Sequence, residues 1–169
     1  SYMFLGELVT NLDLAPDKPV TYDCGDCNRC VTSCPTKALN GDSTMNAKRC
    51  LSFQTQAKGY LAEEYRLKMK SVIYGCDICQ ITCPYNKGIN NEAQTEIDPE
   101  LAYPELQPFI QMSNKEFKEK FDKIAGSWRG KNVLQRNAIY ALDNINDKTE
   151  IQLLEEIANN PNNEVHQEA

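Results

Sequence analysis

The sequence predicts an α+β protein in which a small cysteine-rich domain is followed by a helical region. Three observations support this class. All eight cysteines fall between positions 24 and 83, residues 91–110 carry five acidic and no basic side chains, and apolar residues recur at helical spacing after position 113. We therefore expect a leading tail at residues 1–20, a cysteine domain at 21–90, a linker at 91–112 and a helical region at 113–169.

The cysteines form two related runs. The first is Cys-x2-Cys-x2-Cys-x3-Cys-Pro over 24–35, and the second is Cys-x2-Cys-x3-Cys-Pro over 76–84. The first run is the bacterial ferredoxin signature, in which the fourth cysteine ligates the neighbouring cluster. The x2 spacing turns three thiolates of a tight loop toward one cube, whereas the x3 step points the fourth thiolate away. We therefore predict a ferredoxin-like domain that holds two [4Fe–4S] clusters.

The second run departs from the regular pattern, because Ile73 occupies the position of its expected first cysteine. Cys50, between the two runs, is the one cysteine left to fill the gap. The first cluster is then assigned to Cys24, Cys27, Cys30 and Cys83. The second cluster is assigned to Cys34, Cys50, Cys76 and Cys79. Eight thiolates fill two cubes with none left over.

Two other uses of the cysteines fit less well. A disulfide framework belongs to secreted proteins, no secretion signal is visible, and disulfides have no reason to repeat the cluster spacing. Zinc favours four ligands, often as two Cys-x2-Cys pairs, and the first run exceeds that need.

The remaining segments have simpler signatures. Residues 1–20 resemble the tail of a missing N-terminal domain, and both chain ends look cut. Short helices are expected at about 48–55 and 62–70, and residues 91–112 are expected to be an acidic, proline-containing linker along the surface. Ser113 and Glu116 form a capping-box pattern for a helix that ends at Gly126. Further helices are expected at about 130–144 and after Thr149.

A faint repeat also appears in the helical region. Residues 134–138 resemble residues 165–169 at a period of 31, which suits a truncated repeat of the HEAT type unless the match is coincidence.

Charge and composition narrow the function. The net charge is −6, yet residues 111–136 carry a local excess of four positive charges, which marks either a polyanion contact or a solvated helix face. The one histidine, His166, makes histidine-based catalysis improbable here. No apolar run approaches the roughly 20 residues of a membrane span. We expect a cytoplasmic monomer with no membrane association.

In combination, the motifs resemble those of tRNA epoxyqueuosine reductases over essentially the whole chain. The matching segments are Phe-Leu-Gly-Glu at 4–7, Cys-Gly-Asp-Cys-Asn-Arg-Cys at 24–30, Cys-Pro-Thr at 34–36, Arg-Cys-Leu-Ser at 49–52, Gly-Cys-Asp-Ile-Cys-Gln at 75–80, Cys-Pro at 83–84, Trp-Arg-Gly-Lys at 128–131 and Gln-Arg-Asn-Ala at 135–138. The ferredoxin motif alone is generic. The ordered combination with the lone Cys50 and the helical tail is specific.

The resemblance implies a function. Members of that family reduce epoxyqueuosine to queuosine in tRNA, the last step of queuosine biosynthesis, with cobalamin and two [4Fe–4S] clusters. It implies that the cobalamin domain and the proton donor precede residue 1, so we assign no catalytic residue here. The partners implied are the tRNA anticodon region and a low-potential electron donor such as ferredoxin or flavodoxin.

The resemblance also suggests contacts by position. Residues expected near cobalamin are Cys76, Asp77, Ile78, Cys79 and Lys58. Residues expected near tRNA are Ser52, Tyr60, Trp128, Arg129, Lys131 and Arg136, with core packing an equal alternative for Trp128.

Three other functions fit the sequence less well. A ferredoxin-type electron carrier domain of another oxidoreductase would not need the helical tail. A reductive dehalogenase relative shares the cofactors, but such enzymes are typically exported and lack this tail. A pure tRNA-binding module would leave the cysteines unexplained.

Overall fold

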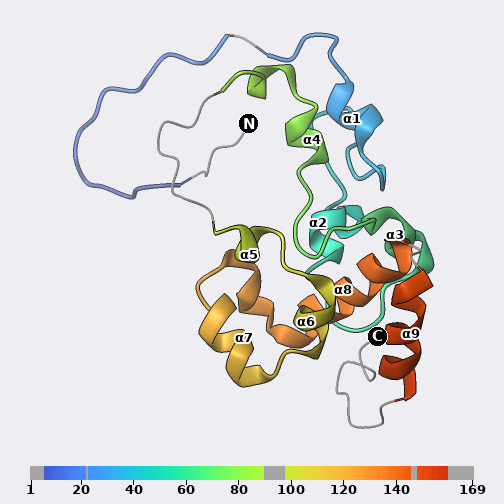
Figure 1. Ribbon diagram of the computed structural model, residues 1–169. Helices are drawn as coiled ribbons and strands as arrows, with labels where there is room; N and C mark the ends of the chain where they lie inside the picture. Colours follow the sequence, from blue (N-terminus) through green and yellow to red (C-terminus); the bar gives the residue numbers. More distant parts are fainter. Residues whose placement is uncertain (1–5, 22, 90–97, 146–147, 160–169) are drawn as a thin grey trace.

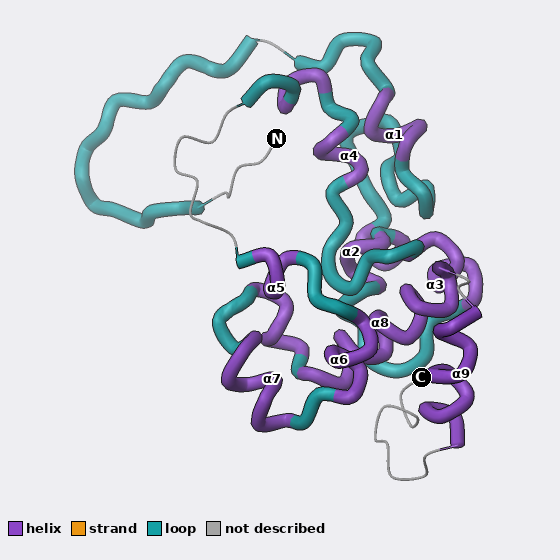
Figure 2. Tube along the Cα trace, viewed as in Figure 1, coloured by secondary structure: helices purple, strands orange, loops and turns teal. Residues whose placement is uncertain are grey.

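The computed structural model describes residues 6–21, 23–89, 98–145 and 148–159, and the side chains of 148–150 are not described. This part of the chain is built from short helices and contains no strand (Figure 2). Its β pairing is limited to an isolated antiparallel bridge between Leu39 and Met45. The predicted α+β, ferredoxin-like class is therefore not confirmed over these residues, because turns and helices organise the cysteine loops. No described helix is both long and apolar enough to cross a membrane.

The cysteine-rich half consists of helical turns around the cysteine loops. Helices α1 and α4 lie side by side in the upper part of the molecule, and α2 and α3 lie below them (Figure 1). The expected helix at 48–55 is a 3₁₀ turn followed by α2, and the expected helix at 62–70 is α3. The bounds are α1 Arg29–Ser33, η1 Ala47–Arg49, α2 Leu51–Gln54, α3 Glu63–Met69, α4 Ile78–Ile81 and η2 Pro84–Asn86.

The second half is a compact group of helices. Their bounds are α5 Pro99–Ala102, α6 Leu106–Gln111, α7 Asn114–Phe121, η3 Ala125–Arg129, α8 Lys131–Ile145 and α9 Lys148–Asn159. The expected linker is wrong for residues 99–102 and 106–111, which form α5 and α6. Phe109 and Ile110 of α6 are each only 3% exposed. Prolines did not prevent these helices, because Pro99 and Pro108 lie in first turns, where backbone N–H groups have no intrahelical partner.

Helix α8 is the central element of the fold. On one side it contributes Leu134, Ala138 and Leu142 to the larger apolar core, in which Phe109 also packs edge-on against Phe121. The opposite side places Tyr140 in a second core formed with α2 and α3. Burial on both sides means that α8 joins the cysteine-rich half to the other helices.

The capping box at the start of α7 is confirmed. The backbone N–H of Glu116 donates to the Ser113 hydroxyl at 3.3 Å, and the Glu116 carboxylate accepts from the Ser113 N–H at 2.8 Å. The bonds from the Ser113 side chain and backbone hold the pKa of Glu116 below its usual range. Two N–H groups at the helix start are thereby satisfied.

Replacing Ser113 by alanine is expected to lower the free energy of unfolding by about 1 kcal/mol, the typical cost of losing an N-cap. Because the folded pKa of Glu116 is depressed, its contribution is present above the ordinary value of 4.5 and is lost as pH falls below it. Urea titrations of both proteins between pH 7 and pH 3 should show the difference shrinking toward acid pH. A constant difference would contradict this coupling.

Gly126 has a different role from the expected one. Helix α7 ends at Phe121, and Gly126 lies within the following 3₁₀ turn. A Cβ atom added to Gly126 would stand 3.1 Å from the ring of Tyr74, closer than most real contacts. The glycine therefore permits a close approach between the two halves. Residues 165–169, the second copy of the suggested repeat, lie outside the described residues, so the HEAT-type interpretation stays a prediction.

Candidate iron–sulfur site

The cysteine-rich half contains four partly buried cysteines on three segments, namely Cys34, Cys50, Cys76 and Cys79. Burial raises the pKa of the Cys76 thiol, and the nearby sulfurs of Cys50 and Cys34 raise it further. The pKa of Cys79 is raised by burial and then by Cys76, Cys50 and Cys34. The contact between α1 and α4 and the hydrogen bond from the Gly75 N–H to the Thr55 hydroxyl bring together the segments that carry these cysteines. These are the four residues that the sequence assigned to the second cluster, with Cys50 among them.

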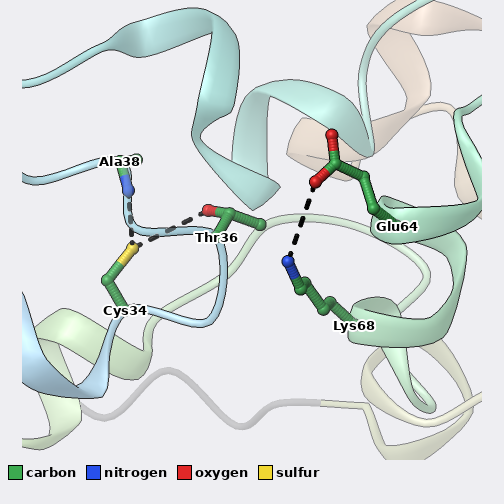
Figure 3. A network of polar contacts seen from close by, with 5 residues as sticks. All are labelled: Cys34, Thr36, Ala38, Glu64 and Lys68. Atoms are coloured by element: carbon green, nitrogen blue, oxygen red, sulfur yellow. Dashed lines mark hydrogen bonds and ion pairs between the residues drawn. The ribbon is translucent and has the colours of Figure 1, made fainter.

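The sulfur of Cys34 forms hydrogen bonds with two nearby groups (Figure 3). The backbone N–H of Ala38 donates to it at 3.3 Å, and the Thr36 hydroxyl lies 3.7 Å away. Partial burial raises the pKa of Cys34, but the hydrogen bonds from Ala38 and Thr36 together bring it below the ordinary value. Hydrogen bonds of this kind stabilise a thiolate and, in iron–sulfur proteins, tune the cluster that it holds.

Two hydrogen bonds hold the two cysteine runs against each other. The hydroxyls of Ser33 and Thr82, each preceding a cysteine, lie 3.3 Å apart, and the Tyr85 hydroxyl donates to the Asp23 carbonyl at 3.3 Å. Asp23 precedes Cys24, and Tyr85 follows the Cys-Pro pair at 83–84. This pairing brings the end of the second run beside the start of the first run. That is the direction in which Cys83 must cross to complete the first cluster.

The donor set fits iron–sulfur clusters. All eight cysteines are free of disulfides, so the disulfide alternative has no support. Within the described residues, no three metal-binding side chains converge on a single ion site. A [4Fe–4S] cube needs no such convergence, because each thiolate binds a different iron. Cys24 and Cys27 are exposed, whereas the cysteines of the second set are partly buried.

Comparison with known proteins agrees with this site. Residues 23–86 match the family model described as "4Fe-4S double cluster binding domain". An epoxyqueuosine reductase from Lactococcus garvieae is 61% identical over 95% of this chain. The chain belongs to the epoxyqueuosine reductase family. It spans about half the length of the curated relatives it matches, covering 46% of the L. garvieae protein and 41% of the Bacillus subtilis one.

Solved structures of epoxyqueuosine reductases have the same fold as the chain. The enzyme from Streptococcus thermophilus superposes with a TM-score of 0.86 at 61% identity, covering 92% of this chain and 42% of its own. An epoxyqueuosine reductase solved with an epoxyqueuosine-modified tRNA stem loop gives a TM-score of 0.82 at 46% identity, covering 88% of this chain and 40% of its own. The fold described here is thus that of the matching part of epoxyqueuosine reductases.

The residues assigned to cobalamin or tRNA near the cysteine runs differ in exposure. Asp77 and Ile78 sit at the start of α4 beside Cys76, and both are exposed. Lys58 and Tyr60 are exposed in the loop between α2 and α3, where Tyr60 is 66% exposed. Ser52 differs, because it is partly buried and its carbonyl accepts from the Thr55 hydroxyl.

Three of the helical-region residues that the resemblance assigned to tRNA, Trp128, Arg129 and Lys131, are exposed or partly buried. Trp128 is 61% exposed, so the core-packing alternative is wrong, and the Arg129 guanidinium lies 3.9 Å from the centre of its ring. The Lys131 ammonium donates to the Met112 carbonyl at 3.3 Å and is half-buried. Trp128 and Arg129 thus offer an aromatic and a cationic surface together.

The expected contact of Arg136 with tRNA is wrong. Arg136 is fully buried, and its guanidinium donates to the carbonyls of Ala57 and Gly59 and to the side-chain oxygen of Asn137. A phosphate could reach it only if these contacts opened. Sequence reasoning mistook a structural arginine for a surface one.

Two site residues escaped the sequence reasoning altogether. Thr55 and Asn137 are both fully buried, and both hydrogen-bond to the segments that carry Cys50 and Cys76. A signal was available, because Gln135, Arg136 and Asn137 are consecutive polar residues in a helix. At 100° per residue they cannot all face solvent on a helix that is apolar on two sides.

Proposed function

We propose that this chain is the iron–sulfur and tRNA-contacting part of an oxidoreductase that reduces epoxyqueuosine to queuosine in tRNA. One observation carries the proposal: a chain of the epoxyqueuosine reductase family matches a double-cluster binding domain over residues 23–86, and Cys50 lies between the two cysteine runs of that domain. A generic ferredoxin motif has no need of a ligand such as Cys50 from outside its two runs.

The clusters would be held by the two sets of four cysteines already assigned. When bound, each [4Fe–4S] cluster supplies transfer of one electron at a time. The protein's part is to hold the thiolates, to donate N–H groups such as that of Ala38 to sulfur, and to limit access of water. The exposed Cys24 and Cys27 make the first cluster the accessible one for an electron donor, and the partly buried second set lies farther along the route.

The reaction needs two electrons. The two carbon–oxygen bonds of the epoxide break, a carbon–carbon double bond forms, and two electrons and two protons convert the epoxide oxygen to water. Two one-electron transfers from a low-potential carrier, such as a ferredoxin or flavodoxin, balance this reduction. Cobalamin would supply the chemistry at the epoxide itself. Asp77 and Ile78, exposed beside Cys76, and the exposed Lys58 would contact it.

The tRNA-contacting surface would centre on the exposed Trp128 and the partly buried Arg129 beside its ring. An arginine over an aromatic ring can meet a phosphate while the ring stacks on a base. Tyr60 offers a second exposed aromatic side chain, whereas Arg136 is removed from this surface by its burial.

Reversing the charge of Arg129 to glutamate is expected to weaken binding of an anticodon stem loop several-fold. Each phosphate contact releases about one counterion, so the slope of log affinity against log salt should fall by about one. Fluorescence anisotropy over a series of salt concentrations measures both quantities. Arg136→Ala, measured per folded chain, serves as the buried control and should leave the slope unchanged. Equal slopes for the Arg129→Glu variant and the unaltered protein would reject this surface.

The chain by itself is expected to leave epoxyqueuosine-containing tRNA unreduced, whereas a version extended to the length of its relatives and supplied with cobalamin should reduce it. The reason is that the resemblance assigns the cobalamin-binding domain and the proton donor to the part of the relatives that precedes residue 1. Mass spectrometry of the digested tRNA under anaerobic conditions gives the readout. Formation of queuosine by the chain alone would contradict the division of labour proposed here.

A further inference from the structure

The irregular ligand set of the second cluster raises a structural question. Regular spacing within a motif fixes the relative positions of its cysteines, but Cys50 and Cys76 come from segments separated by helix α3. Something other than local spacing must set the distance between these two segments. The described contacts place side chains of α8 and α2 in that role.

Asn137 joins the two segments directly. It is fully buried, and its side-chain amide donates to the Thr55 carbonyl at 2.6 Å and to the Ile73 carbonyl at 2.7 Å. Its oxygen accepts from Arg136 at 2.8 Å, which fixes the orientation of the amide, since the nitrogen faces only acceptors and the oxygen faces a donor. Ile73 stands where a regular motif would place a cysteine, and here its backbone is anchored instead.

Thr55 makes a second link between the same segments. Its hydroxyl accepts from the Gly75 N–H at 3.0 Å and donates to the Ser52 carbonyl at 2.8 Å, and the side chain is fully buried. Thr55 therefore connects the helix that follows Cys50 to the residue that precedes Cys76. Gly75 itself has a φ of 76°, so this turn needs a glycine as well as an anchor.

We propose that Asn137 and Thr55 are positioning residues for the second iron–sulfur cluster, which they serve by clamping the segment after Cys50 to the segment before Cys76. The inference rests on the two-cluster function proposed above and extends it. Helix α8 then has a role in holding the cluster, in addition to packing the tail. A buried amide bonded on every side is suited to this, because its directional bonds fix a distance that apolar packing would leave variable.

The test compares two buried amides of the same helix. Asn137→Ala removes the clamp. Gln135→Ala is the matched control, since Gln135 is equally buried and donates to the carbonyls of Phe109 and Ile110, in α6. Both variants of the full chain are reconstituted anaerobically and analysed for iron per folded chain and by EPR and Mössbauer spectroscopy.

We expect the iron content of the Asn137→Ala variant to fall from about eight toward about four per folded chain, with loss of the signal of one cluster. The Gln135→Ala variant should keep both clusters. Equal iron content and equal spectra for the two variants would overturn the inference, since Asn137 would then be a structural residue like Gln135.

Thr55 supplies an independent variant in case Asn137→Ala does not fold. Thr55→Val keeps the shape of the side chain but removes the hydroxyl, and Thr55→Ser restores it. We expect faster loss of one cluster to a chelator with valine, by about tenfold or more, and rescue with serine. Equal rates for valine and serine would count against the clamp.

The same series separates this inference from the proposed function. An unaltered chain that binds only about four irons would overturn both. An unaltered chain that binds eight, with variants that also bind eight and lose them no faster, would overturn the clamp alone.

Discussion

Cys50→Ala is expected to remove the second cluster and leave the first in place. That cluster is assigned to Cys34, Cys50, Cys76 and Cys79, and the loss of one leaves three thiolates for a cube that needs four ligands. Iron after anaerobic reconstitution and desalting should fall from about eight to about four per chain. The EPR spectrum of the reduced protein should simplify to that of a single cluster.

Cys24→Ala is the complementary variant, because Cys24 is assigned to the first cluster and lies at the exposed end of the site. It should also retain about four irons, but with the spectrum of the other cluster. The two single-cluster spectra should differ from each other. Retention of both clusters by Cys50→Ala would mean that Cys50 is not a ligand.

Arg136→Ala is expected to lower the free energy of unfolding by about 3 kcal/mol or more, since each buried acceptor left without a donor costs about 1–3 kcal/mol. The carbonyls of Ala57 and Gly59 and the oxygen of Asn137 would each lose a donor inside the protein. Denaturant titration followed by circular dichroism measures the change. Lysine at this position should recover only part of it, because an ammonium cannot reproduce the fork of a guanidinium.

Arg49→Ala provides the surface control. Arg49 is exposed at the end of η1 and should change the free energy of unfolding by no more than about 0.5 kcal/mol. If Arg136→Ala were as mild as this control, its buried contacts would not stabilise the fold.

The ligand set stays a prediction, and it follows from the sequence alone because cysteine spacing is local and counting assigns the remaining cysteine. Ile73 broke the second run, and Cys50 was the one cysteine available to complete it. Local sequence also predicts the start of α7, because the capping-box residues Ser113 and Glu116 lie within one helical turn.

What could not be predicted depends on contacts between distant segments. The role of Arg136 is set by carbonyls 77 and 79 positions away in the chain, and no local pattern separates such an arginine from one on the surface. The prolines and acidic side chains of residues 91–112 predict a linker. Phe109 and Ile110 bury there because α8 provides an apolar face for them. The absence of described strands likewise reflects loops shaped by turns around the cysteines.

Iron and spectroscopic analysis of the anaerobically reconstituted chain tests the central claim most directly. Two complete sets of four thiolates predict about eight irons and about eight acid-labile sulfides per chain, with Mössbauer parameters of two [4Fe–4S] clusters. About four irons per chain, or stoichiometric zinc in place of iron, would contradict it.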